Sequence, residues 1–258
     1  MCITACKNKT KSGIIVDNII KSSKTVLENE GLIKFRVGNI ITMSKCSSKT
    51  FYSIYEDKCD LLLCLWIRSS TSDYLVNFDN KKHQLNNLEL MLLPFLITLS
   101  IRERSPSSNK AVSSCVNSSI WSGSSPQKEC KVRLRVNFFW DWVRKHGEKL
   151  LSDNILQGSR RDIDLLCKKL SFLLRGFIWV HDSELVNNNL SHHDCSFQQL
   201  LSNELLPFGV EQAELNYCIE HCNAVIIQLL SNRKEQNNCQ SCCILDQKII
   251  DYQFDGSA

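Results

Sequence analysis

Residues 19–62 read IIKSSKTVLENEGLIKFRVGNIITMSKCSSKTFYSIYEDKCDLL, and this stretch decides the predicted fold. A first helix is expected from residue 14, because apolar residues recur there at helical spacing and a glycine at 31 suits the C-cap. A second, shorter helix follows around Val37 and Ile40, and a third covers SKTFYSIY with Ser47 as its N-cap. Asp57 suits the N-cap of a longer fourth helix. Two short helices joined by about three residues are typical of a helix-turn-helix.

The rest of the chain also favours helices. Only 9 Gly and 4 Pro occur in 258 residues, which argues against a turn-dense sandwich or barrel. Helical periodicity returns over residues 83–101, 131–153, 160–184 and 211–232. We therefore predict an all-α protein, with Pro94 kinking or splitting the helix that contains it. The Ser-rich residues 102–129 are predicted to form a long mobile loop, in which Trp121 is the residue that can dock.

Positive charge is concentrated near the N-terminus. Residues 1–68 contain eleven Lys and Arg and six Asp and Glu, a net charge of +5, whereas the whole chain carries +4. The remaining 190 residues therefore carry a net charge of −1. An electropositive N-terminal region attracts polyanions such as nucleic acid.

The segment 19–62 resembles the DNA-binding domain of the TetR family of bacterial repressors. The residues that carry the resemblance occur in the family's order: Gly31, Val37, Ile40, the turn around Ser47, Thr50-Phe51-Tyr52, Tyr55 and Lys58. The resemblance implies an N-terminal three-helix helix-turn-helix domain, followed by a C-terminal helical bundle that binds ligand and dimerises. It also implies that Tyr52 and Lys58 contact DNA phosphates.

Three residues depart from the family pattern. Arg36 replaces a small Thr or Ser at the start of the second helix, and Ile41 replaces an Ala. Lys45 replaces the Gly of the turn, where a residue with a side chain at positive φ costs about 1 kcal/mol or more. Arg36 and Lys45 are compatible with DNA binding, since each can add a phosphate contact.

The third predicted helix has the character of a recognition helix. Such a helix needs apolar residues on its inner face and polar residues on its outer face, with its first turn entering the major groove. Phe51, Ile54 and Tyr55 are expected to pack inward. The residues predicted to contact DNA are Arg36, Lys45, Ser47, Ser48, Lys49, Thr50, Tyr52 and Lys58.

The predicted organisation has three parts. Residues 1–60 form the DNA-binding domain, residues 61–231 bind an effector and a second subunit, and residues 232–258 are a Cys-rich tail. Aromatic residues suggest a pocket for an apolar or aromatic molecule, formed by Phe95, Phe138, Phe139, Trp142 and Phe177. The last two long helices, over residues 160–184 and 211–232, carry apolar faces broader than a helix needs to pack on one side of a small domain. The excess apolar surface suggests a second subunit, and the predicted dimer interface comprises Leu173, Phe177, Ile226 and Leu230.

Cysteines offer two further hypotheses. Cys218, His221 and Cys222 lie at i, i+3 and i+4, which suits zinc if a fourth ligand comes from residues 192–195, but buried thiols explain the spacing better. We predict no metal and no cofactor. As an alternative function, Cys218, Cys222 or the tail cysteines 239, 242 and 243 would sense oxidation. A third reading is a helical interaction protein that has lost DNA binding.

Several classes of protein are not expected. The sequence contains no catalytic motif of the hydrolase, P-loop, Rossmann or zinc-protease type, so we predict no enzyme. The N-terminus lacks the apolar core of a secretory signal, and 14 Cys without a regular framework indicate the reducing cytoplasm. Residues 85–101 are too few to span a membrane. The expected partners are a palindromic double-stranded DNA operator, a second copy of the chain and an unknown small-molecule effector.

Overall fold

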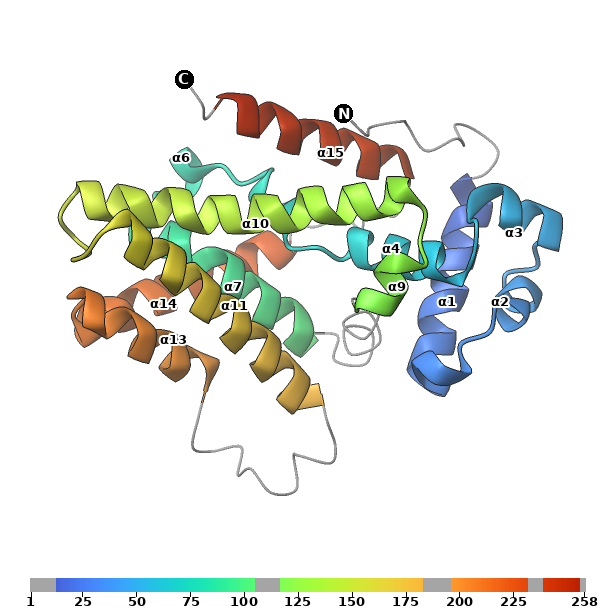
Figure 1. Cartoon of the computed structure of the whole chain (residues 1–258), viewed down its shortest axis with the longest axis horizontal. Coiled ribbons are helices and arrows are strands. Elements are labelled where there is room, and N and C mark those ends of the chain that lie inside the picture. Colours follow the sequence, from blue (N-terminus) through green and yellow to red (C-terminus); the bar gives the residue numbers. More distant parts are fainter. Residues whose placement is uncertain (1–12, 105–116, 183–195, 232–238, 256–258) are drawn as a thin grey trace. The chain divides into compact units, whose positions relative to one another are not determined.

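The computed structural model describes residues 13–104, 117–182, 196–231 and 239–255. These residues form helices and no strand, as expected for an all-α protein (Figure 1). No helix in these ranges has the length and apolar character to cross a membrane.

The first helices agree closely with the predicted ones. Their bounds are α1 Gly13–Lys34, α2 Val37–Met43, α3 Ser48–Ile54 and α4 Lys58–Arg68. Helical backbone is interrupted in α1 at Gly31, where φ is 70° and ψ is 175°. A residue with a Cβ adopts this φ only under strain, which explains a glycine at this position. Ser47 and Asp57 cap α3 and α4 as expected, by accepting hydrogen bonds from the amides of Thr50 and Asp60.

The later helices correct the prediction of a long loop over residues 102–129, exclude a split at Pro94 and give the tail a fold. They are α5 Ser72–Leu75, α6 Asn80–His83, α7 Asn87–Arg104, α9 Ser118–Ser122, α10 Pro126–Ser152, α11 Arg160–Asp182, α13 Phe197–Leu205, the 3₁₀ helix Leu206–Phe208, α14 Gln212–Ser231 and α15 Cys239–Asp255. Helix α7 continues through Pro94, so the proline does not split it. The supposed loop 102–129 contains the end of α7, all of α9 and the start of α10. Within the tail, residues 239–255 are helical.

The ends of the supposed loop are ordered by specific contacts. Asn117 caps α9 by accepting the Ile120 amide at 3.0 Å. The Ser125 amide donates to buried Asp60 at 2.8 Å, immediately before the helix that Pro126 begins. Trp121 packs against the apolar core formed with α1–α4, which confirms that it docks. Residues 105–116 lie outside the described part of the chain.

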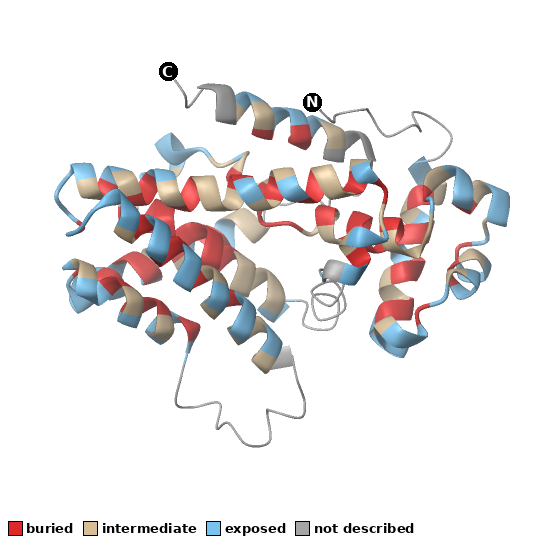
Figure 2. Cartoon of the chain, in the orientation of Figure 1, coloured by how far each residue is buried: buried red, intermediate tan, exposed pale blue. Residues whose placement is uncertain are grey.

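The chain forms two compact units whose limits differ from the predicted domains. Among the described residues, unit 1 comprises 13–78, 101–104, 117–138 and 239–255, and unit 2 comprises 79–100, 139–182 and 196–231. Unit 1 therefore extends beyond residue 60, because α4, the first half of α10 and α15 pack with the N-terminal helices. Figure 2 shows buried residues along the inner sides of these helices and exposed residues on their outer sides.

Candidate nucleic-acid interface

Helices α2 and α3 are joined by a tight turn, residues 44–47. The Ser44 amide donates to the Ile40 carbonyl at 2.8 Å and its hydroxyl to the same oxygen at 2.7 Å. Lys45 then adopts φ 54°, the left-handed region in which the related turn usually has glycine. The turn therefore keeps the backbone conformation that Lys45 put in question, at the strain expected for a residue with a Cβ.

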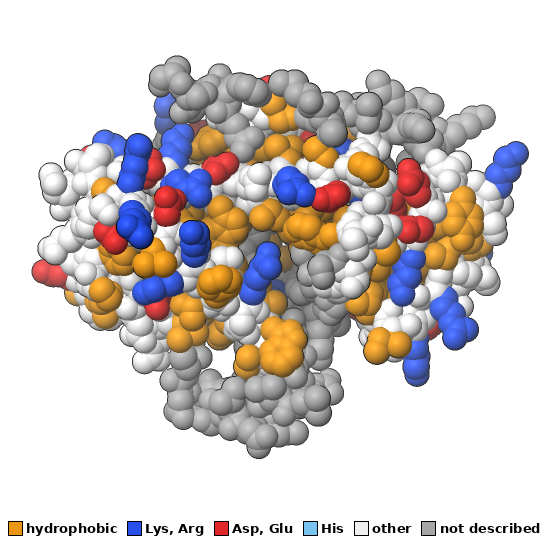
Figure 3. All heavy atoms as spheres, in the orientation of Figure 1, with side chains coloured by type: hydrophobic (Ala, Val, Ile, Leu, Met, Phe, Trp, Pro, Cys, Tyr) orange, Lys and Arg blue, Asp and Glu red, His pale blue; other side chains and the backbone are white. Residues whose placement is uncertain are grey.

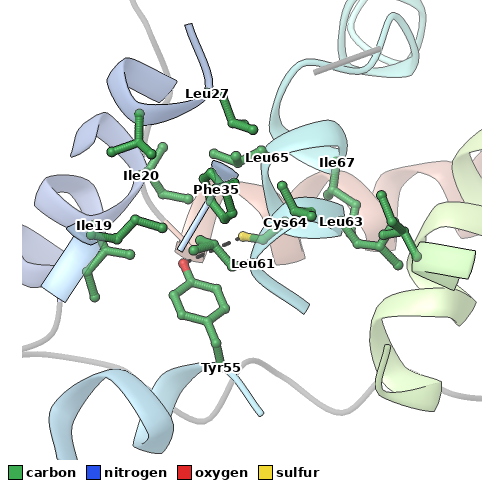
Figure 4. Packing of buried hydrophobic residues seen from close by; sticks show 14 of the residues in the cluster. Ile19, Ile20, Leu27, Phe35, Tyr55, Leu61, Leu63, Cys64, Leu65 and Ile67 are labelled. Carbon is green, nitrogen blue, oxygen red and sulfur yellow. Dashed lines mark hydrogen bonds between the residues drawn. The ribbon is translucent and has the colours of Figure 1, made fainter. Parts of the chain in front are cut away.

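The inner face of α3 is anchored in the core of unit 1. Phe51 and Tyr55 are buried, as is Ile40 of α2, and Ile54 is half-buried. The Tyr55 hydroxyl points towards the Cys64 sulfur of α4, 3.8 Å away (Figure 4). Burial of these side chains fixes which face of the short helix remains outside, as the sequence predicted.

The outer face of α3 is polar and accessible. Ser48, Lys49 and Ser53 are exposed, and 56% of Tyr52 is accessible to solvent. Lys45, in the turn before the helix, is exposed as well. Figure 3 shows Lys and Arg side chains spread over the surface of α1–α3. This face can offer hydrogen-bond donors and positive charge to a polyanion.

Two predicted contact residues are already hydrogen-bonded to one another. The Ser47 hydroxyl accepts the Thr50 amide at 3.0 Å and lies 2.8 Å from the Thr50 hydroxyl. Ser47 is therefore a helix cap, and Thr50 is half-buried beside it. Arg36 lies apart from them, exposed at the N-cap of α2, where its side chain makes no capping hydrogen bond.

Lys58 is the predicted residue most involved in the fold. It lies at the first turn of α4, where its ammonium donates to the Leu32 carbonyl at 3.1 Å and lies 5.5 Å from the centre of the Phe35 ring. An ammonium has three N–H donors, of which Leu32 takes one. Lys58 thus joins the end of α1 to the start of α4, in addition to any contact with phosphate.

Sequence reasoning missed the end of α1, after Gly31. Ile33 is 97% exposed there, and its neighbour Lys34 is exposed too. The Lys58 contact to Leu32 joins this end of α1 to the start of α4. Only the left-handed Gly31 could have indicated that the following apolar residue leaves the helical face.

The predicted pocket residues divide into separate groups. In unit 2, the Phe95 ring lies 5.5 Å from Phe139 and 6.3 Å from Phe197, and Phe197 lies 5.3 Å from Phe177. These centroid distances are those of rings packed against one another. Trp140 also joins this aromatic cluster, 4.9 Å from Phe139. Phe197 was missed because nothing in its local sequence indicates this distant contact.

The other two predicted pocket residues lie elsewhere. Phe138 belongs to unit 1, where its ring lies 5.2 Å from Tyr252 of α15. Trp142 is buried in unit 2 and donates its indole N–H to the Leu90 carbonyl at 2.7 Å.

One of the four predicted dimer residues is enclosed by its own chain, and the other three are partly accessible. Ile226 is 1% exposed and belongs to the core of its own chain, while Leu173, Phe177 and Leu230 are half-buried. A side chain enclosed by its own chain cannot also pack on a partner, so Ile226 is not available for the interface.

The suggested zinc residues have internal partners. Cys218 and Cys222 are buried, and burial raises the pKa of both thiols, that of Cys218 to about 11. His221 Nδ1 lies 2.6 Å from Glu89, and the Cys222 thiol donates to the Glu89 carbonyl at 3.4 Å. Among the described residues, no group of three or more His, Cys, Asp or Glu side chains is arranged to hold a metal, and residues 192–195 lie outside them.

No protein-family model, curated protein or solved structure matches the chain.

Proposed function

We propose that the chain is a ligand-responsive transcriptional regulator of the TetR type, a cytoplasmic repressor that binds a palindromic operator as a homodimer. The observation that supports this best is α3 itself. It is a seven-residue helix, anchored by Phe51 and Tyr55, whose first turn presents Ser48 and Lys49 to solvent after a tight turn from α2. A short helix held in this way can enter a major groove with its N-terminal residues leading.

Phosphate contacts would position this helix. Lys45, Tyr52 and Arg36 are exposed donors around it, and Lys58 lies at the N-terminus of α4, where backbone amides favour an anion. The first 68 residues carry a net charge of +5, whereas the remaining residues carry −1. Long-range electrostatic attraction and local hydrogen bonding therefore both favour DNA binding by unit 1.

A second copy of the chain would pack on α11. Leu165, Phe172 and Trp179 are 53%, 74% and 68% exposed and follow one another at seven-residue intervals. Residues seven apart lie nearly in line along an α-helix, so these three form one apolar stripe. Figure 3 shows apolar and basic side chains together over α11. An exposed apolar stripe of this kind favours association, and it replaces Ile226 as the proposed interface.

The effector would bind in unit 2. A ligand releases the operator only to the extent that it binds one state of the dimer more tightly than the other. Because Phe95, Phe139, Phe177 and Phe197 are in mutual contact, an apolar effector that enters among them must displace a ring. Its entry would therefore shift the helices that carry these residues.

Selection from a pool of random duplexes tests DNA recognition directly. The protein is expected to enrich a palindrome whose half-site centres lie roughly 34 Å apart or a multiple of this. Lys49→Gln is expected to change the preferred base at one position in each half-site by about 1–3 kcal/mol, since Lys49 is exposed on the first turn of α3. Absence of any enriched sequence would contradict specific recognition.

Light scattering tests the dimer. The expected mass is twice that of the 29.6 kDa chain, and Phe172→Glu is expected to give monomers that bind DNA poorly. Ile14→Glu is the matched control, because Ile14 is equally apolar and exposed but lies in unit 1. A monomeric wild-type protein at micromolar concentration, or equal effects of the two substitutions, would contradict the assigned stripe.

A further inference from the structure

The C-terminal helix α15 is held on unit 1 by a buried carboxylate. Asp246 is fully buried, 2.8 Å from the ammonium of Lys131 and 3.0 Å from the guanidinium of Arg135, both on α10. Arg135 also donates to Asp246 through Nε at 3.1 Å. Local sequence predicted no fold for this tail, and its cysteines only offered candidate thiol sensors. Figure 1 shows its helix running beside α10.

Arg135 connects this docked helix to α4 and α5. Its Nη1 donates to the Ile67 carbonyl at 3.0 Å, to the Ser70 hydroxyl at 3.0 Å and to Asp73. Its own carbonyl accepts the Ser72 hydroxyl at 2.8 Å. One side chain therefore contacts α15 and the C-terminal end of α4, the helix whose other residues form the core with α1 and α3.

Docking of α15 brings a carboxylate to two buried cations. Lys131 and Arg135 both pair with Asp246, and Arg135 also pairs with Asp73. Undocking α15 takes the Asp246 carboxylate away from both cations. A buried charge without its partner is strongly unfavourable, so Arg135 would have to rearrange, together with its contacts to α4.

Cys243 lies within this contact. It precedes Asp246 by three residues, on the same face of α15, and its sulfur lies 3.5 Å from the Lys131 ammonium. The residue is half-buried, whereas Cys218 and Cys222 are buried. An ammonium stabilises negative charge on a neighbouring sulfur, and the thiolate is the form that attacks disulfides.

We propose that α15 is a thiol-controlled latch on unit 1, which a low-molecular-weight disulfide opens by reacting with Cys243. The Cys243 thiolate attacks one sulfur of oxidised glutathione, a new S–S bond forms, the original S–S bond breaks, and one glutathione thiolate leaves. A tripeptide attached to the Cys243 sulfur replaces its contact with Lys131 by a bulky group, and in this proposal it lifts α15 from α10. The consequence for DNA binding, transmitted through Arg135 and α4, rests on the proposed function.

Hydrogen exchange of the full chain, read by mass spectrometry before and after treatment with oxidised glutathione, tests the latch. Amides of α15 are expected to be protected in reduced protein and to lose protection once Cys243 is modified. Cys243→Ser should keep its protection under the same treatment. Cys46→Ser, which removes another half-buried thiol of unit 1, should respond like wild type. Failure of Cys243 to react, or unchanged protection after it has reacted, would overturn the proposal.

Asp246→Asn provides a second test without oxidant. It retains most of the side chain but removes the charge that balances Lys131 and Arg135, so α15 is expected to exchange rapidly in reduced protein; full protection would overturn the latch. Duplex affinity of the same samples separates the two proposals. Undocking without any change in measurable duplex affinity contradicts transmission through Arg135. Undocking in a protein that binds no DNA in either state supports the latch and contradicts the proposed function.

Discussion

Helix α3 and helix α14 each carry reactive or polar residues at helical spacing, and the structure uses them in opposite ways. On α3, the apolar residues turn inward and Ser48, Lys49 and Tyr52 remain exposed. On α14, Cys218 and Cys222 are buried, and His221 is hydrogen-bonded to Glu89. A family resemblance made α3 a candidate site, and the spacing of Cys218, His221 and Cys222 made α14 one. The difference lies in which side chains already have partners inside the protein.

The largest predicted effect concerns the anchor of α3. Phe51 is fully buried, so Phe51→Ala is expected to lower the free energy of unfolding by about 3–5 kcal/mol. Its exposed neighbour Tyr52 serves as control, because Tyr52→Phe is expected to change stability by no more than about 0.5 kcal/mol. Urea unfolding measures both. Equal, small effects would show that the inner face of α3 is not packed as described.

A second prediction concerns a buried histidine of unit 2. Burial, with a contribution from Lys145, lowers the pKa of His146 to about 4, and its Nε2 has no hydrogen-bond partner among the residues that the structure describes. The unfolded chain, with a histidine pKa near 6.5, binds the proton more readily, so stability falls as the pH drops below that value.

Lowering the pH from 7 to 5 is expected to reduce the free energy of unfolding by about 2 kcal/mol through His146. This value follows from its pKa in the folded and unfolded chains, at about 1.36 kcal/mol per pKa unit. In His146→Gln, which does not titrate, that part of the pH dependence should disappear. Unfolding curves at the two pH values give the comparison. Identical pH dependence in the variant and wild type would mean that His146 is solvated.

The two lysines at the candidate interface are expected to differ. Lys58 donates to the Leu32 carbonyl, so Lys58→Ala should lower the free energy of unfolding by about 1.5 kcal/mol, as well as weakening DNA binding. Lys49 is exposed, and Lys49→Ala should weaken DNA binding while changing stability by no more than about 0.5 kcal/mol. Thermal or urea unfolding alongside duplex titration separates the roles, and equal stability losses would contradict the distinction.

The smallest predicted effect concerns α14. Since His221 and Cys222 both contact Glu89, a chelator such as EDTA should leave the unfolding midpoint unchanged. A midpoint that falls with chelator and recovers with zinc would restore the metal hypothesis for Cys218, His221 and Cys222.

Local sequence predicted local structure well and distant contacts poorly. Gly31, Ser47 and Asp57 mark helix ends through their own backbone or capping chemistry, which acts over a few residues. The pairing of Asp246 with Arg135 joins residues more than one hundred positions apart, so no periodicity could indicate it. The predicted loop 102–129 was partly wrong for the same reason, since Ser125 is fixed by Asp60.

The candidate site followed the same rule. Phe51, Tyr55 and Lys49 lie inside or outside as helical periodicity predicted. The pocket and interface residues were chosen from apolar character alone, which does not specify a partner. Phe138 faces Tyr252, and Ile226 is enclosed by its own chain.

The salt dependence of binding to a random-sequence duplex tests the central claim most directly. Wild-type protein is expected to bind more weakly as salt rises, with a slope of log K against log salt that steepens by about 0.9 for each phosphate contact. The double variant that combines Lys45→Ala and Lys49→Ala should bind more weakly. Its slope should be flatter by up to about two units per subunit, if both lysines contact phosphate. Lys81→Ala with Lys82→Ala, which removes two exposed lysines of unit 2, should leave the slope unchanged. Absence of duplex binding, or equal slopes for both double variants, would contradict DNA binding through α3.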